Sequence, residues 1–348
     1  MYYIKSLKDI GKENISLAGG KGASLGELTE AGVSVPRGFV LTSEAFESFL
    51  EVTKIQEEIN ALFQKVDKEK MHTIEYISEI IQGLILSADM PIDIIDEIEQ
   101  GYSNLGTELV AVRSSATAED GVNTSWAGQL ESFLNTTQET LIQNVQKCWA
   151  SLYTPRALFY RLENNSGEDS ISVAVVIQKM IQSEVSGIAF SVHPVTEDHN
   201  RMVIEACYGL GDAVVSGSLT PDTYIVGKVP LCLLDTSISK QERMITLNDE
   251  REEKVLKANI WKRVEESLQT KQKISEDEIF ELSKIIQKVE NHFGFPVDVE
   301  WGYQNKKFFI LQSRPITTLS EKKKEEKRNA VFQGTRTVRG PNDGDFVE

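Results

Sequence analysis

Hydrophobic residues recur at helical spacing through the first half of the chain. This pattern predicts helices over residues 23–31, from Thr42 or Ser43 onward, over the charged stretch 55–102, and over 138–163. Gly32 follows the first of them, and glycine readily adopts the positive φ that ends a helix. In the last of them, the predicted buried stripe consists of Val145, Cys148, Trp149, Leu152 and Tyr153.

From residue 172 the pattern changes to short apolar runs between turn residues, which is typical of β-strands. Strands are predicted over 109–113, 172–177, 187–192, 202–206 and 224–229, then a helix over 250–292 and a hairpin of 297–303 with 308–312. This order predicts an α/β (α+β) chain. Its length suits two lobes, which we place at about 1–180 and 181–318. Residues 319–348, rich in charge and then in Gly and Pro, are typical of a linker or disordered tail.

Acidic and apolar residues alternate in the C-terminal hairpin. Period-two alternation places Asp298 and Glu300 on one face of the strand and Trp301 on the other. We expect a three-residue loop, 305–307, which fixes the register of the return strand. The cross-strand partners are then Glu300 with Gln312, Asp298 with Arg314, Trp301 with Leu311, and Tyr303 with Phe309.

The polar face of this hairpin suits a hard cation. Mg²⁺ prefers oxygen ligands and often takes only one or two of them from the protein. Glu300 and the amide oxygen of Gln312 are therefore candidate metal ligands, and Arg314 is a candidate partner for a phosphate. The alternative is a surface hairpin whose polar residues face water.

An arginine and several small hydroxyl residues end the predicted strand at 109–113. Arg113 offers a planar fork to phosphate, and small side chains let a backbone close over a polyanion. Gly128, in Ala127-Gly-Gln129, is a candidate lid position above this floor. The pattern indicates a nucleoside triphosphate site. A structural ion pair of Arg113 is the alternative, and Glu119 and Asp120 are either lid residues or a solvated turn.

Three further segments are candidates for nucleotide contacts. Lys21, in a glycine-rich turn, could reach a phosphate, although the turn is not a P-loop and a solvated lysine is the alternative. The segment of Gln178, Lys179, Met180 and Ile181 could offer backbone groups and apolar walls to adenine, or be an ordinary strand end. Glu205 could bind ribose hydroxyls or cap a turn.

Composition narrows the class of protein. The formal net charge of −16 argues against a nucleic-acid binder, which usually carries a basic patch. The sequence contains neither a run of about 18 apolar residues, as a membrane span requires, nor a signal-peptide core. The three cysteines have no CxxC spacing and are expected to be reduced thiols of a cytoplasmic protein. The four histidines show neither metal-ligand spacing nor the small-residue loop of a phosphoryl acceptor.

Seven motifs occur together in a fixed order. They are Gly19-Gly-Lys-Gly-Ala-Ser-Leu-Gly26, Val35-Pro-Arg-Gly-Phe39, Arg113-Ser-Ser-Ala-Thr-Ala-Glu-Asp120, Trp126-Ala-Gly-Gln129, Cys148-Trp-Ala-Ser-Leu152, Tyr208-Gly-Leu-Gly-Asp-Ala-Val-Val-Ser-Gly217 and Gln312-Ser-Arg-Pro-Ile316. With them, residues 14–318 resemble the nucleotide-binding domain of the pyruvate phosphate dikinase family, which includes phosphoenolpyruvate synthase and rifampin phosphotransferase. The resemblance implies an ATP-grasp fold, in which two α/β lobes clamp ATP. It also implies an enzyme that passes the β-phosphoryl group of ATP to a histidine, leaving AMP and phosphate.

The resemblance assigns a role to each candidate residue. Lys21, Arg113 and Arg314 would contact the phosphates and act in catalysis, and Gly128 would belong to the lid. Gln178, Lys179, Met180 and Ile181 would hold adenine, and Glu205 the ribose. Glu300 and Gln312 would ligate Mg²⁺.

The chain also departs from the family pattern. It lacks the Gly/Thr/Ser-His-Ala loop that carries the acceptor histidine, and its lid has Gly121-Val122-Asn123 and Trp126 where the family commonly has proline and phenylalanine. We therefore expect an excised domain, or a protein that works with a separate swivelling phosphohistidine domain in trans. The alternatives are a non-catalytic nucleotide-binding module and an ATP-grasp ligase that forms ADP.

Overall fold

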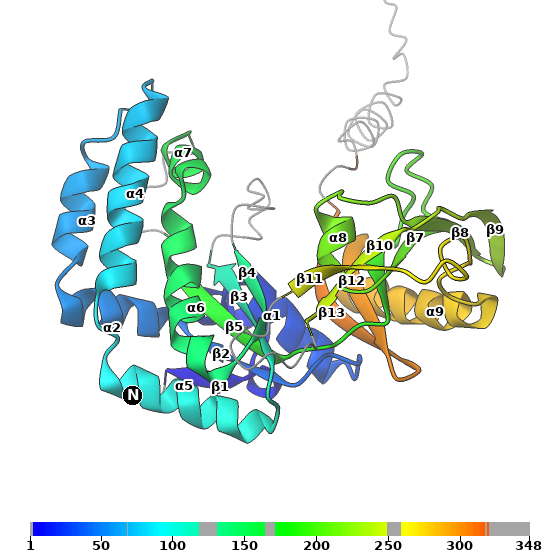
Figure 1. The fold of residues 1–348 in the computed structure, drawn as a ribbon, viewed down its shortest axis with the longest axis horizontal. Coiled ribbons are helices and arrows are strands. Elements are labelled where there is room, and N and C mark those ends of the chain that lie inside the picture. Colours follow the sequence, from blue (N-terminus) through cyan, green and yellow to red (C-terminus); the bar gives the residue numbers. More distant parts are fainter. Residues whose placement is uncertain are drawn as a thin grey trace, which may run out of the picture.

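The chain forms two lobes, each built from a β-sheet and helices (Figure 1). The computed structural model describes residues 3–67, 69–117, 131–163, 171–248, 259–316 and 319. The mixed α/β class and the two lobes expected of an ATP-grasp protein are confirmed. Gly128, Glu119, Asp120 and all of the expected tail except residue 319 lie outside the described residues.

Lobe one is built on a five-stranded antiparallel sheet. Its strand order is β1 (Ile4–Ser6), β2 (Gly38–Leu41), β5 (Val173–Lys179), β3 (Val110–Ala116) and β4 (Ser132–Thr136). Two short 3-10 helices, η1 (Leu7–Asp9) and η2 (Lys12–Asn14), precede the first long helix. Helices gather against one face of the sheet, and Figure 1 shows α3, α4 and α7 on the side away from lobe two. They are α2 (Ser43–Thr53), α3 (Gln56–Phe63), α4 (Met71–Ser87), α5 (Ile92–Leu105), α6 (Gln138–Ala150) and α7 (Pro155–Glu163).

The predicted helices of lobe one are present but shorter than expected. The stretch 55–102 divides into α3, α4 and α5, with Pro91 as the residue before the third helix. The stretch 138–163 is interrupted by η3 (Ser151–Tyr153) and restarts at Pro155, because proline is tolerated only in the first turn of a helix. The predicted stripe is buried, and Trp149 packs between Phe46 and Phe49, with ring centroids 5.4 and 4.9 Å away.

Helix α1 (Ile15–Glu30) belongs to both lobes. It begins earlier than predicted and contains a kink at Gly19, whose φ is 66°. Ala18 and Leu25 of this helix pack on the sheet face of lobe one opposite to the other helices, in one small cluster. Its second half adds Leu28 to the core of lobe two. Gly32 follows with a φ of 68°, which confirms the predicted helix end.

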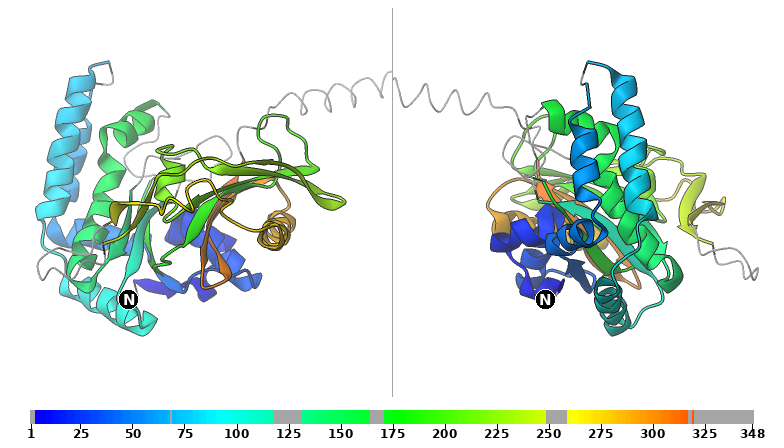
Figure 2. Two further views of the ribbon diagram at one scale, coloured as in Figure 1. Left: turned by 45° about the vertical axis from the view of Figure 1, so that its right-hand side comes forward. Right: turned by 90° about the vertical axis from the view of Figure 1, so that its left-hand side faces the viewer.

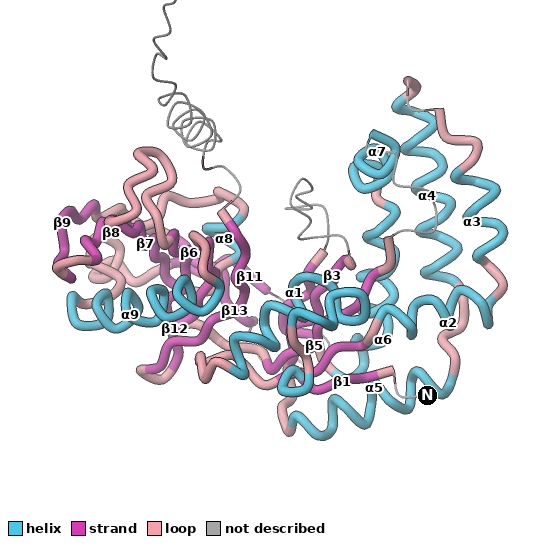
Figure 3. The backbone as a smooth tube through the Cα atoms, turned by 180° about the vertical axis from the view of Figure 1, so that it is seen from behind, coloured by secondary structure: helices cyan, strands magenta, loops and turns pink. Residues whose placement is uncertain are grey.

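Lobe two is built on a six-stranded antiparallel sheet. Its order is β13 (Lys307–Pro315), β12 (Val297–Gln304), β6 (Val185–Phe190), β7 (Arg201–Tyr208), β8 (Asp222–Lys228) and β9 (Leu231–Ser237). Helix α9 (Glu276–Phe293) lies against one face of this sheet, as Figures 2 and 3 show. A short helix, α8 (Asp212–Val215), follows β7. Two strands, β10 (Arg243–Leu247) and β11 (Asn259–Arg263), pair only with each other among the described residues.

The predicted helix over 250–292 is wrong in its first part. Residues 259–263 form strand β11, and the helix begins only after Ser275. The Ser275 hydroxyl accepts from the backbone N–H of Glu278, and the Glu278 carboxylate accepts from the backbone N–H of Ser275. This capping box fixes the helix start. The strands predicted at 109–113, 172–177, 187–192, 202–206 and 224–229 are present, with shifted ends.

The C-terminal hairpin has the predicted register at its polar end and a different one near its turn. Glu300 lies opposite Gln312, and Asp298 opposite Arg314, as predicted. The turn, however, contains two residues rather than three: Asn305 and Lys306 have φ values of 52° and 58°, and Lys307 already belongs to β13.

A β-bulge between Glu300 and Trp301 absorbs the difference of one residue. Trp301 therefore pairs with Ile310 and Tyr303 with Phe308, and the predicted partners Leu311 and Phe309 are wrong. Leu311 is the extra residue of the bulge. The expected apolar face is confirmed, because the side chain of Trp301 is fully buried in the core.

Within the described ranges, no helix combines the length and apolar character that spanning a bilayer requires.

Candidate functional site

A row of polar side chains crosses the sheet of lobe two on the face opposite to α9. Gln312 on β13 lies opposite Glu300 on β12, which in turn lies opposite Ile188 on β6. The register of β6 with β7 then places Glu205 next in the row. Glu300, Gln312 and Glu205 therefore share one face, as the two-residue period of the strands requires.

Arg113 of lobe one reaches this row from β3. Its Nη2 donates to Gln312 Oε1 at 2.6 Å and to Glu300 Oε2 at 3.1 Å. Its Nη1 donates to the backbone carbonyl of Leu311, the bulge residue, at 2.6 Å. The arginine is only 9 % exposed, so these bonds are shielded from water. The ion pair that the sequence left open for Arg113 exists, and it joins the two lobes.

Arg314 lies beside this contact and pairs with Asp298. Its Nε and Nη2 both lie within 2.8 Å of Asp298 Oδ2. Burial raises the pKa of Asp298, Arg314 lowers it, and the nearby Glu300 carboxylate raises it further. Burial and Asp298 together raise the pKa of Glu205. The acids on this face thus interact with one another and with the arginines.

Asp212, at the start of α8, is a site residue that the sequence reasoning missed. Burial is the main cause that raises its pKa; Arg113 lowers the pKa and Glu300 raises it. The Asp212 carboxylate therefore interacts electrostatically with both Arg113 and Glu300, the two charged partners of the interlobe contact. The sequence feature that could have indicated this role is the position of Asp212 in the motif Tyr208-Gly-Leu-Gly-Asp, which follows the end of β7. That motif contributed to the resemblance, but no role was assigned to its acid.

The glycine-rich turn brings Lys21 to the same face of lobe one as Arg113. Gly19 packs directly on Ser115, whose hydroxyl donates to the carbonyl of Ala18 at 2.8 Å and accepts from Gly22 N–H at 3.2 Å. Ser115 is two residues beyond Arg113 on β3, and residues two apart on a strand share a face. Lys21 is half-buried in the helix turn that follows the kink.

Comparisons with known proteins show which family the chain belongs to. A family model described as pyruvate phosphate dikinase, AMP/ATP-binding domain, matches residues 15–334. The chain belongs to this family. The AMP/ATP-binding domain is 42 % identical to a probable phosphoenolpyruvate synthase of Methanocaldococcus jannaschii over 334 residues, which are 94 % of this chain and 28 % of the relative. It is 36 % identical to the phosphoenolpyruvate synthase of Pyrococcus furiosus over 379 residues, 97 % of this chain and 46 % of the relative.

The AMP/ATP-binding domain thus spans less than half the length of these two relatives. A solved structure, the D-alanine–D-alanine ligase from Bacillus anthracis, aligns over 89 % of this chain and 62 % of the ligase chain, with 10 % sequence identity. The TM-score of 0.32 is too low to support an inference. The resemblance stated from the motifs is confirmed by the family match.

The expected adenine segment runs from the end of β5 into the connection between the lobes. The side-chain amide of Gln178 donates to the carbonyl of Pro36 at 3.3 Å, and the side chain of Lys179 is exposed. The backbone N–H of Lys179 donates to Arg37, and that of Met180 to Leu109. Both N–H groups are thus engaged within this AMP/ATP-binding domain.

Met180 supplies an apolar surface at this junction. It forms a buried cluster with Ala111 of β3 and Leu210 of lobe two. Ile181, the last residue of the segment, is also buried and lies near Gly302. Partly buried side chains that flank the cluster are Leu109, Leu134 and Ile245. Both lobes therefore contribute to one apolar wall beside the connection.

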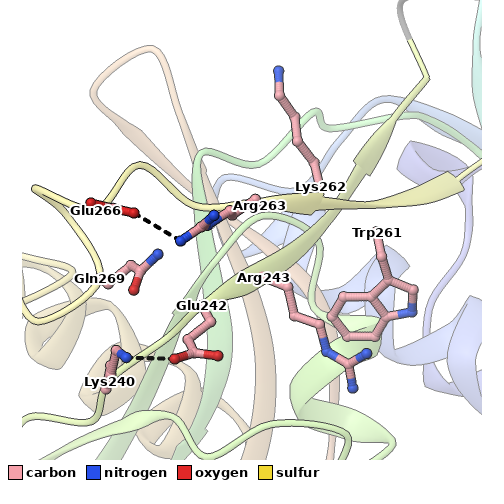
Figure 4. Close-up of a pocket in the computed structure, with 8 residues that line it drawn as sticks. All are labelled: Lys240, Glu242, Arg243, Trp261, Lys262, Arg263, Glu266 and Gln269. Carbon is pink, nitrogen blue, oxygen red and sulfur yellow. Dashed lines mark hydrogen bonds and ion pairs between the residues drawn. The ribbon is translucent and has the colours of Figure 1, made fainter.

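The strands β10 and β11 carry a separate surface hollow of about 590 Å³ (Figure 4). The Arg243 guanidinium lies 4.3 Å from the centroid of Trp261, and Lys262 points away from both. The other lining residues are Lys240, Glu242, Arg263, Glu266 and Gln269. None of the candidate nucleotide residues lines this hollow, so it is not the site predicted from the sequence.

Within the described ranges, no group of three His, Cys, Asp or Glu side chains could hold a metal ion by itself. A cation at Glu300 and Gln312 would therefore need further ligands from a phosphate or from water, which is the usual situation for Mg²⁺.

Proposed function

We propose that this AMP/ATP-binding domain binds Mg·ATP between its lobes and is the ATP-using component of a dikinase-type phosphotransferase. The main support is the convergence of Arg113 from lobe one with Glu300 and Gln312 from lobe two on one point. Phosphoryl transfer depends on positioning and charge neutralisation, and this point combines a cation with two oxygen ligands. The proposed unit covers residues 1–318, with the remaining residues as a linker.

Glu300 and Gln312 would hold the magnesium ion. Their fit is supported by one observation: the carboxylate oxygen of Glu300 and the amide oxygen of Gln312 both lie within 3.1 Å of the same cationic nitrogen. When bound, the ion supplies neutralising charge to the phosphate oxygens. Lys21, Arg113 and Arg314 would orient the triphosphate around it.

The base and ribose would lie beside the connection between the lobes. The apolar wall around Met180 suits the faces of an adenine ring, and the segment 178–181 borders it. Glu205, on the polar row of lobe two, would accept from ribose hydroxyls. Gly128 would belong to the loop that covers the phosphates.

The phosphoryl acceptor would be a histidine on a separate domain or protein. ATP and water would give AMP and inorganic phosphate, with the β-phosphoryl group left on the histidine. In this chain His193 Nδ1 accepts from the backbone N–H groups of Val195 and Thr196, which is a turn-forming role. The relatives are more than twice as long as the matched region, so the acceptor has room elsewhere in such proteins.

Nucleotide product analysis tests this proposal. The folded chain is incubated with Mg·ATP, with and without a histidine-bearing partner domain from a relative, and the products are separated by chromatography. We expect AMP and phosphate, with phosphate label retained on the partner. Formation of ADP, or no ATP binding by calorimetry, would contradict the proposal.

Glu300→Ala provides the matched site variant. Loss of a metal ligand should lower Mg²⁺-dependent ATP use by at least about tenfold, since even outer partners of metal ligands have effects of 10- to 100-fold. Glu75→Ala, on the exposed surface of α4, removes the same charge away from the site and should change nothing. Equal activities of the two variants would remove Glu300 from the site.

A further inference from the structure

The guanidinium of Arg113 occupies the place where the two candidate metal ligands converge. Its Nη2 satisfies Gln312 Oε1 and Glu300 Oε2, and its Nη1 satisfies the Leu311 carbonyl. All three acceptors come from the hairpin, whereas the arginine comes from the opposite lobe. The contact is largely shielded from water, since Arg113 is 9 % and Gln312 8 % exposed and the Glu300 side chain is 23 % exposed.

We propose that Arg113 is a resident cation that keeps the metal ligands of the nucleotide-free protein occupied, so that a divalent ion binds well only with its nucleotide. The proposal rests on the proposed function. The lone pairs that Glu300 and Gln312 offer to Nη2 are the ones a metal ion would use. Two cations cannot share them, because like charges at such distances repel strongly inside a protein.

The triphosphate resolves this competition. A guanidinium fork binds phosphate as readily as carboxylate, so the incoming nucleotide offers Arg113 a second set of acceptors. Arg113 then moves from the hairpin to the phosphates as the metal takes its place. A metal ion that arrives alone offers no such exchange, because it would take the hydrogen-bond acceptors of the buried guanidinium without supplying others.

The same contact orients the ligands before the metal arrives. The hydrogen bond from Nη2 requires the oxygen of the Gln312 amide, not its NH₂ group, to face the site. The β-bulge leaves Leu311 as the extra residue of its strand, and its carbonyl accepts from Nη1. The arginine thereby holds the hairpin in the arrangement that a hard cation needs.

Mn²⁺ binding without nucleotide tests this role. Free Mn²⁺ is measured by its electron paramagnetic resonance signal in titrations of the folded chain, checked by circular dichroism. Arg113→Gln removes the charge but retains an amide donor, and it should bind Mn²⁺ at least about tenfold more tightly than the unmodified chain. Arg113→Lys keeps a charge but loses the fork, so its affinity should lie between the two.

Arg314→Gln is the charge-matched control, because Arg314 forms its ion pair with Asp298, whereas Arg113 bonds the two ligands. Its Mn²⁺ affinity should rise by less than about threefold. The double variant Arg113→Gln with Glu300→Gln should lose the gain, which would locate the bound ion. Equal gains for the Arg113 and Arg314 variants, or no gain in folded Arg113→Gln and Arg113→Lys, would overturn the proposal.

The outcome is separable from that of the proposed function. The Mn²⁺ titrations need no nucleotide, and ATP binding is measured independently by calorimetry. A chain that binds ATP but shows no Mn²⁺ gain contradicts the role of Arg113 alone. A chain that shows the gain but never binds ATP contradicts the proposed function and supports the competition between the two cations.

Discussion

At the scale of single residues, the candidate site combines acids that are costly to bury with cations that offset them. Burial raises the pKa of Glu205, Asp212 and Asp298. Arg314 contacts Asp298, and Arg113 lowers the pKa of Asp212. A buried carboxylate destabilises the folded state when it is charged. The residues of this site are therefore arranged for binding cations rather than for stability.

This arrangement predicts a pH-dependent effect of Glu205→Gln. The folded state holds the Glu205 proton above the ordinary pKa of 4.5, where the unfolded state releases it. The free energy of unfolding therefore falls as pH rises from 4.5 through the raised pKa. The glutamine variant lacks this loss, so its stability relative to the unmodified chain should increase over that interval and then level off.

Urea denaturation at a series of pH values measures this difference. The contribution of Asp212 is common to both chains and cancels to a first approximation, whereas the coupling of Glu205 with Asp298 is part of the measured difference. If the difference in unfolding free energy between Glu205→Gln and the unmodified chain stays constant between about pH 4.5 and 8, burial does not raise the pKa of Glu205.

At the scale of elements, the sequence predicted faces better than it predicted turns and bulges. Alternation placed Asp298 and Glu300 on one face, and the expected loop placed Gln312 opposite Glu300, in the register that keeps the apolar residues inside. The two-residue turn at Asn305 and Lys306 escaped prediction because Lys is an unusual residue at positive φ. The bulge at Leu311 compensated for that error at the polar end of the hairpin.

Other predictions failed for local reasons in one case and for long-range reasons in two. The strand β11 was read as helix because its neighbours on both sides are charged and its apolar run is short. Arg113 was assigned to phosphate from its residue type, but its contact with the hairpin spans 187 positions in sequence. No local pattern predicts such a pairing. The same holds for Asp212, whose environment is made by residues of other elements.

The turn of the hairpin gives a prediction at this scale. Lys306 has a φ of 58°, which costs about 1–2 kcal/mol for a residue other than glycine. Lys306→Gly should relieve this strain and, after the greater freedom of the unfolded chain is subtracted, stabilise the protein by about 0.5 kcal/mol. Chemical denaturation measures the change. Lys307→Gly, one residue later in β13, should destabilise it, and the same sign for both variants would contradict the two-residue turn.

At the scale of the whole molecule, the described residues of the two lobes meet at several places. They include the connection beside Met180, the contact of Arg113 with the hairpin, helix α1, and the bond from Asn135 of β4 to Asn259 of β11. Ser24 of α1 also donates to the carbonyl of Ser313 at 3.0 Å. Because the glycine-rich turn lies within α1, the position of Lys21 depends on how this helix sits between the lobes.

Gly19→Ala tests that dependence. A Cβ at this position would lie 2.2 Å from the carbonyl oxygen of Ser115, and its φ of 66° disfavours a side chain. We expect a loss of about 3 kcal/mol or more in the free energy of unfolding, from strain and overpacking together. ATP affinity, measured by calorimetry below the unfolding transition, should fall as Lys21 is displaced.

Gly83→Ala in α4 is the matched control, since its Cβ would meet nothing within 4 Å. Alanine favours a helix over glycine by about 1 kcal/mol, so this variant should be neutral or stabilised. If Gly19→Ala is as stable as the control, the glycine-rich turn does not pack closely against Ser115 of β3.

The shared helix has a practical consequence for dissecting this protein. Cutting near residue 180 separates the two sheets, but it leaves Leu28 and Val33 on the first fragment, although both pack in the interior of the second. A fragment that starts at residue 181 would expose to solvent the apolar surface that Leu28 and Val33 cover in the intact chain. The two fragments expressed separately should therefore be poorly soluble. Mixing them should restore a folded complex only when the first fragment includes α1.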